Sequence, residues 1–208
     1  TVLTILILTR LVAQFGTEAL AGYGIGTRLE FLLVPVAFAV GVASVPLVGM
    51  AIGAGRIARA RRAAWTAAAL ATALLGGLGL IVTLAPDLWT GLFSRDPAVL
   101  DAAADYFRWA GPVYGLFGLG LSLYFSSLGA GKAVGPVLAG TLRLVMVAGG
   151  GLLLAMWQTP TWTIFALLSA GMAVYGFSSV VFVRLTPWGE ESEPPRSAAS
   201  RVAAPHGG

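Results

Sequence analysis

Four charged side chains lie inside long apolar stretches of this sequence: Arg10, Arg28, Glu30 and Arg143. An ionisable group in a water-poor interior is costly unless it is paired or hydrated, so such residues are functional candidates by default. Glu30 is the acidic member of the set, and Arg28 precedes it by two residues. That spacing directs the two side chains to different faces of a helix, so we predict separate roles for them.

The depth of these charges follows from helix geometry. Glu30 precedes Arg56 by about 39 Å of helix, which predicts a position near a membrane interface or at the mouth of a cavity. Arg143 follows Lys132 by about 16 Å, close to the membrane midplane. Glu30, Arg28 and Arg143 are therefore candidate coupling or cavity-mouth charges. For Glu30 the alternative is an interfacial carboxylate paired with an arginine of a neighbouring helix, such as Arg10.

The sequence gives little support for enzyme catalysis or for a metal site. The chain has no cysteine, and its one histidine, His206, lies near the C-terminus. A cysteine-based or histidine-based metal site is therefore not expected. A membrane-embedded enzyme would need convergent catalytic groups at membrane depth, and the apolar stretches hold no pair of carboxylates. We expect no enzyme activity, no metal and no cofactor.

The composition indicates a membrane protein. Hydrophobic residues make up 57% of the 208 positions and charged residues 11%, whereas soluble domains are roughly 45–50% apolar and about 25% charged. The mean hydropathy is +0.85. The net charge of +4 does not indicate nucleic acid as a partner, because the basic residues stand at the ends of apolar segments rather than on one soluble face.

The apolar segments predict an all-α polytopic membrane protein with six transmembrane helices, because about 20 apolar residues cross the hydrocarbon core. The predicted helices cover residues 1–15, 19–53, 63–86, 106–130, 133–157 and 160–183. The first is too short for a full crossing, which suggests a fragment that begins inside a helix. These helices form one domain, residues 1–186, and the polar stretch 187–208, which is rich in Pro, Ser and Glu, is predicted to be a disordered tail.

The basic residues in the loops predict the orientation. Arg56, Arg59, Arg61 and Arg62 follow the second helix, Lys132 follows the fourth, and Arg184 ends the last, so all of them fall on one side. That side is expected to be cytoplasmic, together with the C-terminus. The stretch GAGRIARARR, residues 53–62, is then a cytoplasmic turn whose glycines end a helix, because no strand precedes it as a phosphate-binding loop requires.

Aromatic and sulfur-containing side chains in the predicted helices are candidates for the wall of a substrate cavity, because apolar and aromatic walls tolerate varied shapes and attract cations. The residues are Phe38, Met50, Tyr114, Phe117 and Tyr124. Trp89, Trp109, Trp157 and Trp162 fall at the opposite ends of the helices and are predicted interfacial anchors. Asp96 and Pro97 have the types of an N-cap and a first helical residue.

Five features carry a resemblance to a known family: FGTEALAGYGIGTRLEF at residues 15–31, Pro35, LVGM at residues 47–50, the GAG turn before Arg59 and Ala60, and LGAGK at residues 128–132. The first four resemble the seventh and eighth transmembrane helices of multidrug and toxic compound extrusion (MATE) transporters, and LGAGK resembles the turn after the tenth helix of that family. The passages from Pro35 to Arg56 and from Pro112 to Lys132 also resemble each other, which suggests a parallel internal repeat.

The resemblance implies that this chain is the C-terminal six-helix lobe of a twelve-helix MATE-type transporter, with the N-terminal lobe, the lipid bilayer and small organic substrates as partners. It implies secondary active efflux of amphipathic or cationic compounds in a bacterial inner membrane, driven by a proton or sodium gradient. Sodium-coupled members carry an acidic residue one turn after a tyrosine. Here Gly118 stands one turn after Tyr114, so protons are the preferred coupling ion.

Two alternatives remain open from the sequence. A lipid-linked precursor flippase of the same superfamily would need a strongly cationic cavity, for which Arg10, Arg28 and Arg143 are the available side chains. The second alternative is a non-catalytic membrane subunit. The buried Arg143 and the repeated GAG turns argue against it, because an inert helix bundle needs neither.

Overall fold

The structure is a computed structural model that describes residues 9, 12–13, 16–157 and 160–188. In the described part all regular structure is helical. The elements are α2 (Thr17–Gly53), α3 (Ile57–Leu84), α4 (Asp87–Thr90), α5 (Pro97–Ala110), η1 (Gly111–Val113), α6 (Tyr114–Gly129), α7 (Val134–Trp157) and α8 (Thr161–Leu185).

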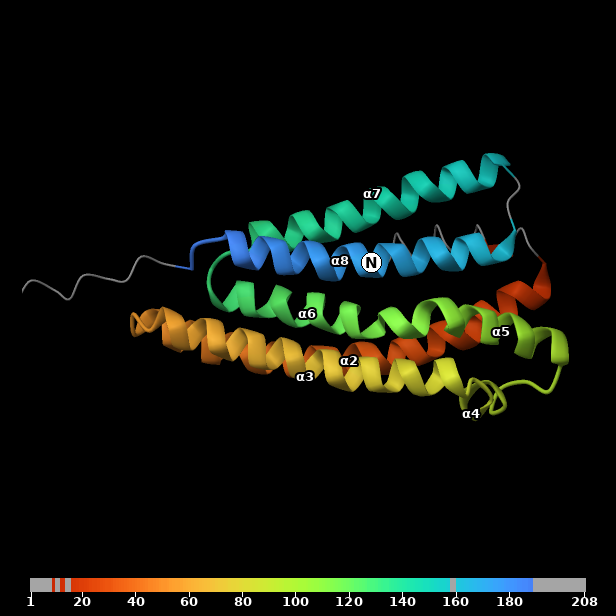
Figure 1. The fold of residues 1–208 in the computed structure, drawn as a ribbon, viewed down its shortest axis with the longest axis horizontal. Coiled ribbons are helices and arrows are strands. Elements are labelled where there is room, and N and C mark those ends of the chain that lie inside the picture. Colours follow the sequence, from red (N-terminus) through yellow and green to blue (C-terminus); the bar gives the residue numbers. More distant parts are fainter. Residues whose placement is uncertain (1–8, 10–11, 14–15, 158–159, 189–208) are drawn as a thin grey trace, which may run out of the picture.

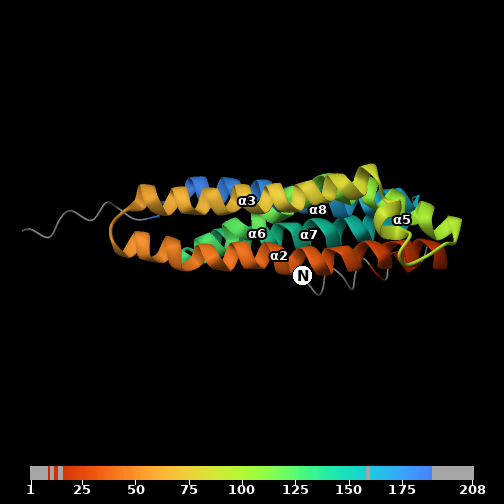
Figure 2. The same cartoon turned by 90° about the horizontal axis from the view of Figure 1, so that it is seen from below.

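The long helices lie side by side in an elongated bundle (Figure 1). Helix α6 packs against α2, α3 and α8, while α7 packs mainly against α8 and makes few contacts with α6. A short turn joins α2 to α3 at one end of the bundle, as Figure 2 also shows. The packing is therefore tight around α6 on three sides and loose on the side that faces α7.

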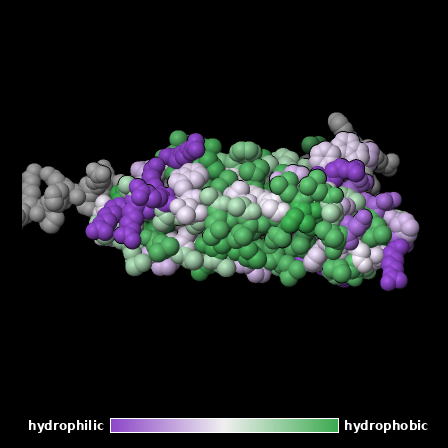
Figure 3. Space-filling view, turned by 60° about the horizontal axis from the view of Figure 1, so that its bottom comes forward, coloured by the Kyte–Doolittle hydropathy of each residue, from purple (hydrophilic) through white to green (hydrophobic). Residues whose placement is uncertain are grey.

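Four of the described helices, α2, α3, α7 and α8, are long and apolar enough to cross a membrane. Large hydrophobic side chains remain exposed along these helices. Figure 3 shows a broad hydrophobic band on one face of the bundle, with hydrophilic residues gathered toward its two ends. This distribution is that of a multi-pass membrane protein, in which lipid replaces water around the middle of each helix.

Three predicted spans agree with α2, α7 and α8 to within two residues. Helix α3 begins at Ile57 rather than at residue 63, so Arg59, Arg61 and Arg62 lie in its first turns and not in a loop. The turn itself is confined to Ala54–Arg56. The predicted helix 1–15, with Arg10, lies almost wholly outside the described residues.

The predicted span 106–130 was wrong as one continuous helix. It divides into the end of α5, the 3-10 turn η1 and α6. Pro112, which has no N–H group and disfavours a continued α-helix, lies in the middle of η1. The start of α5 agrees with the sequence: Pro97 is its first residue, and the Asp96 carboxylate accepts a hydrogen bond from the Ala98 N–H at 3.0 Å.

The two GAG turns have the same geometry, which confirms that glycines end these helices. Gly55 has φ 70° and Gly131 has φ 68°, a region that glycine adopts without strain. At the first turn, Arg56 N–H donates to Ala51 O and Gly55 N–H to Ile52 O. Lys132 and Gly131 repeat the same pair of bonds, which form a Schellman motif that leads directly into the next helix.

The basic residues predicted to set the topology gather at one end of the bundle, where the α2–α3 turn, the α6–α7 turn and the end of α8 meet (Figure 1). Arg56, Arg59, Arg62 and Lys132 are exposed. The prediction of disorder from residue 187 was wrong for Trp188, which is buried and belongs to a hydrophobic cluster with side chains of α2, α3, α6 and α8. The prediction for residues 189–208 lies outside the described residues.

Glycines bring α3 and the α5–α6 segment into backbone contact. A Cβ at Gly79 would overlap the carbonyl oxygen of Gly111, and a Cβ at Gly118 would lie 2.9 Å from Ala71 O. Gly76 and Gly115 face each other in the same seam. Small residues at such positions let helices approach closely enough for extensive van der Waals contact in lipid.

The glycine contact between α3 and the α5–α6 segment leads to a prediction about stability. Replacing Gly79 by Ala forces a methyl group against the Gly111 carbonyl, which we expect to lower the free energy of unfolding by about 1–3 kcal/mol, as overpacking does. Thermal unfolding of the purified protein in detergent measures the change. Gly77→Ala is the matched control, because a Cβ there meets no atom within 4 Å. A Gly79 variant as stable as the Gly77 variant would show that the seam is not tightly packed.

Candidate functional site

A stripe of residues one turn apart on α2 faces α5. A Cβ at Gly22 would lie 2.8 Å from the Cβ of Ala102, and a Cβ at Gly26 would overlap the ring of Tyr106. Glu30 follows one turn later on the same face, because residues four apart are stacked on a helix. The two glycines thus let α5 approach until the Tyr106 ring lies beside the Glu30 carboxylate.

Two tyrosine hydroxyls converge on one oxygen of Glu30. The Tyr106 hydroxyl donates a short hydrogen bond to Glu30 Oε1, and the Tyr114 hydroxyl lies 3.5 Å from the same atom. Both tyrosine side chains are buried, whereas Glu30 is half-buried. The carboxylate therefore has donors supplied by the chain itself, at the level where α5 passes into α6.

Aromatic rings fix the position of Tyr106. Its ring makes edge-to-face contacts with Tyr23 on the same α2 face, with Phe107, and with Phe165 of α8, at centroid distances of 5.4–5.7 Å. Such pairs each contribute about 0.5–1.5 kcal/mol beyond burial. The donor to Glu30 is thus held rigidly by three helices.

Arg28 does not take part in this cluster. Its side chain is exposed, and its guanidinium carbon lies 5.0 Å above the centre of the Phe93 ring. Arg28 and Glu30 point to different faces of α2, as their spacing predicts.

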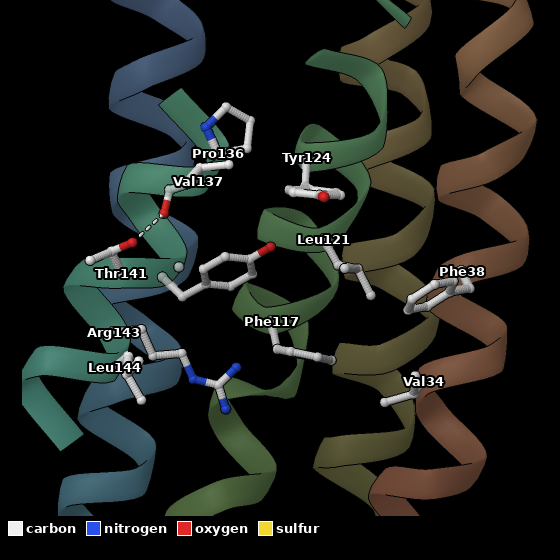
Figure 4. A pocket seen from close by; sticks show the side chains of 12 residues that line it. Val34, Phe38, Phe117, Leu121, Tyr124, Pro136, Val137, Thr141, Arg143 and Leu144 are labelled. Atoms are coloured by element: carbon white, nitrogen blue, oxygen red, sulfur yellow. Dashed lines mark hydrogen bonds between the residues drawn. The ribbon is translucent and has the colours of Figure 1, made fainter. Parts of the chain in front are cut away.

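A separate cavity of about 560 Å³ lies between α2, α6, α7 and α8, beside the loosely packed face of α6. Figure 4 shows side chains from these helices directed into one space. Its volume lies within the range of pockets for small organic ligands, about 300–1,000 Å³. The lining residues are Val34, Phe38, Phe117, Leu121, Tyr124, Pro136, Val137, Gly140, Thr141, Arg143, Leu144 and Tyr175.

Arg143 is the one residue of a charged type among these lining residues. Its side chain extends from α7 toward Phe117 of α6 (Figure 4). The guanidinium carbon lies 5.5 Å from the centre of the Phe117 ring and 5.9 Å from that of Tyr175. Its Nε atom is buried and has no hydrogen-bond partner in the described part of the chain. Aromatic faces therefore stabilise the cation.

The predicted cavity residues divide into two groups. Phe38, Phe117 and Tyr124 line the cavity. Tyr114 is buried beside Glu30 instead, and Met50 is exposed near the C-terminal end of α2, away from the cavity lining.

Glu30 and the cavity are neighbours on α2. Val34, which lines the cavity, follows Glu30 by one helical turn. The charges of Arg143 and Glu30 attract each other, but the two groups form no direct ion pair. Among the residues that the structure describes, the one salt bridge joins Arg108 and Asp105, and both of its side chains are exposed. Arg143 thus lines the cavity, while Glu30 lies one helical turn from the lining residue Val34.

Gly118, at the position where the resemblance implies an acidic residue in sodium-coupled proteins, faces α3. Its Cα is packed so closely against Ala71 and Leu75 that a Cβ would lie 2.9 Å from Ala71 O and 3.1 Å from Leu75 Cδ2. A carboxylate has no room at this position. The acidic group beside Tyr114 comes from α2 instead.

Tyr106 and Tyr175 were not among the site residues predicted from the sequence. Tyr106 stands where the predicted span began, so nothing suggested that it reaches α2. The spacing of Gly22, Gly26 and Glu30 is the signal that was available, because small residues four apart mark a helix contact. No sequence signal locates Tyr175, whose position depends on how α8 packs against α6 and α7.

The Tyr106–Glu30 bond makes an energetic prediction. We expect a double-mutant cycle of Tyr106→Phe and Glu30→Gln to give a coupling energy of about 1–3 kcal/mol, because removing one partner leaves a half-buried charged group without its donor. Thermal unfolding in detergent measures each variant. Tyr124→Phe paired with Glu30→Gln is the control, since the Tyr124 hydroxyl makes no bond to Glu30. Equal coupling in both cycles would contradict the assigned contact.

Comparisons with known proteins agree with this architecture. A profile of the MatE family matches residues 1–153. The uncharacterized transporter C323.07c of Schizosaccharomyces pombe is 34% identical over 126 residues, which cover 61% of this chain and 22% of that relative. The chain thus spans about a fifth of the length of the relative it matches. With the family profile matched over most of its length, the chain belongs to the MatE family of membrane transporters.

Proposed function

We propose that the protein is a secondary active efflux transporter that exchanges amphipathic or cationic organic compounds for protons by alternating access. The observation that carries the proposal is a cavity of about 560 Å³ with mainly apolar and aromatic walls, one helical turn from a half-buried glutamate. An adaptable aromatic wall suits substrates of varied shape, and a carboxylate at its edge attracts cationic ones.

Glu30 is the residue proposed to carry the coupling proton. Ionised, it attracts the positive end of a substrate. Protonated, it loses that attraction, so the proton and the substrate compete for one group. Such competition is what an exchanger requires, because each ligand then favours release of the other. The hydroxyls of Tyr106 and Tyr114 lie within hydrogen-bond distance of the carboxylate, so the chain supplies donors to it at this position.

A proton suits this site better than a sodium ion. Hard metal cations are bound by several oxygen ligands. The described groups within hydrogen-bond distance of Glu30 are two tyrosine hydroxyls that act as donors to it. The tight packing of Gly118 leaves no second carboxylate beside Tyr114.

The proposal includes a partner for the exposed side of α2. Phe31, Leu32, Phe38, Val42 and Leu47 are large apolar residues with 43–64% exposure along this helix. An N-terminal six-helix lobe packed against this side would complete the wall of the cavity and allow access to alternate between the two membrane faces. The lobe, a bacterial inner membrane and a cytoplasmic C-terminus are parts of the proposal that rest on the family and on the placement of basic residues.

A lipid-linked precursor flippase is the second candidate, and Arg143 is the observation that favours it. A phosphate headgroup needs cationic contacts, and Arg143 is directed into the cavity. A single guanidinium among the described lining residues is a weak match for a pyrophosphate with several charges. The efflux transporter is therefore the leading proposal.

Transport in vesicles tests the proposal. We expect protein expressed from the complete natural gene to move a fluorescent organic cation under an imposed pH gradient and not under a sodium gradient alone. Glu30→Gln should lower the pH-driven rate at least about tenfold, because the amide cannot exchange a proton. Glu18→Gln is the matched control, since Glu18 is exposed in the first turn of the same helix.

Two outcomes of this transport measurement would contradict the proposal. A Glu30→Gln protein that is folded and still transports at the wild-type rate under the pH gradient would remove Glu30 from the coupling. Absence of transport by folded wild-type protein under either gradient would instead favour the flippase.

A further inference from the structure

The end of the bundle that holds the α2–α3 turn, the α6–α7 turn and the end of α8, here called the basic end, carries cations without carboxylates in the described part of the chain. The described acidic residues lie in the first half of α2, in α4, in α5 or directly before α5. Figure 3 shows hydrophilic side chains collected at the basic end of the face that it draws. The cations of the basic end are Arg56, Arg59, Arg61, Arg62, Lys132 and Arg184.

Two of these cations meet at the junction between α3 and α8. The guanidinium carbon of Arg184 lies 5.6 Å from the centre of the Trp65 ring. Arg61 precedes Trp65 by one turn on the same face of α3, and its Nη2 donates a long hydrogen bond of 3.4 Å to Thr186 O. A guanidinium has five N–H donors. Within the described residues most of these donors therefore have no acceptor.

Tryptophan packing holds the two cations in place. Trp65 packs against the hydrophobic cluster that joins α2, α3, α6 and α8 at the basic end. Trp188, two residues after Thr186, is buried in the same cluster. The segments that carry Arg61 and Arg184 are thus fixed relative to each other, and the junction presents two guanidiniums together.

An apolar surface adjoins the junction. Val181 and Phe177 precede Arg184 by three and seven residues, on the same side of α8, and are 49% and 60% exposed. On α3, Ala69 follows Trp65 by one turn and is exposed. A phosphate bound to the arginines would therefore have apolar helix surface beside it, which fits a headgroup joined to acyl chains.

The junction lies on a side of the bundle that remains open to lipid. Figure 2 shows α3 and α8 along the side opposite α2. The proposed N-terminal lobe packs against the exposed side of α2, so it does not cover the contact of Arg184 with Trp65. Lipid is then the neighbour of this junction.

We propose that Arg61 and Arg184, with Trp65 between α3 and α8, bind the headgroup of an anionic phospholipid. Guanidiniums bind phosphate oxygens through paired N–H groups, and two of them favour a headgroup with two negative charges. The acyl chains of this lipid lie along Val181 and Phe177. The inference does not depend on the proposed transport, because it requires only that the chain lies in a membrane.

Such a site differs from the general attraction of basic residues to an anionic membrane surface. That attraction depends on the number of cations at the basic end and hardly on which ones they are. Arg59 precedes Arg61 by two residues and points to a different face of α3. Arg56 and Arg59 are exposed. Removing this pair therefore removes the same charge as removing Arg61 and Arg184, but leaves the junction intact.

Lipid titration tests the inference. Protein from the complete gene, purified in detergent and freed of lipid, is titrated with cardiolipin, which carries two phosphates, or with phosphatidylcholine, which has no net charge. Native mass spectrometry measures the affinity for the first bound lipid. We expect cardiolipin to bind about tenfold to a hundredfold more tightly than phosphatidylcholine, as two charge-assisted contacts predict.

Variants assign this preference to the junction. Arg61→Gln with Arg184→Gln should remove most of the preference for cardiolipin, whereas Arg56→Gln with Arg59→Gln should change it less than about twofold. Arg61→Lys keeps the charge without the planar fork and should give an intermediate preference. Thermal unfolding of the lipid-free proteins checks that each variant is folded. Equal loss in the two double variants, or no loss in either, overturns the inference.

Two further arms identify the occupant. Displacement of cardiolipin by inorganic pyrophosphate at equal concentration would assign the junction to a soluble anion and overturn the lipid. Glu190, Glu191 and Glu193 follow Trp188 in the sequence and are an internal alternative. If cardiolipin binds through Arg61 and Arg184 only after all three are replaced by Gln, this acidic stretch is the occupant and the inference is wrong. Unchanged cardiolipin binding in that variant supports it.

Discussion

The structure depends on one constraint: inside a membrane, where water is scarce, a carboxylate is costly unless the protein supplies hydrogen-bond donors to it. Glu30 meets this constraint through the hydroxyls of Tyr106 and Tyr114. Gly26 provides the space for the Tyr106 ring, and the 3-10 turn η1 stands between the two tyrosines. The close contact of α2 with α5 and the break before α6 thus both serve one carboxylate.

The two faces of α6 explain why a cavity lies beside that carboxylate. On one face, Gly115 and Gly118 bring its backbone against α3, which fixes its position. On the opposite face, α7 makes few contacts with it, and aromatic side chains of α6 with Arg143 of α7 border an open space. The proposed alternating access would use this difference, because a helix with few contacts can move without disturbing the packed core.

The sequence predicted the elements better than their contacts. Helix lengths follow from apolar runs, and the GAG turns follow from the need for φ > 0, so α2, α7, α8 and both Schellman turns were predictable. The division of 106–130 was not, because Pro112 in an apolar run is compatible with either a kink or a break. Tyr106 and Tyr175 reach the site through packing between distant helices, for which a single sequence holds no direct signal. Trp188 was misplaced because the polar residues after it dominate the local composition.

Proton release on substrate binding tests the central claim, that Glu30 exchanges a proton for the positive group of a substrate. The ethyl ester of rhodamine B, a cation without a carboxylate, is added to protein from the complete gene in weakly buffered solution at several values of pH. The account predicts proton release by the wild-type protein that is absent from the Glu30→Gln protein. Equal release by both proteins, while the ester binds to both, would contradict it.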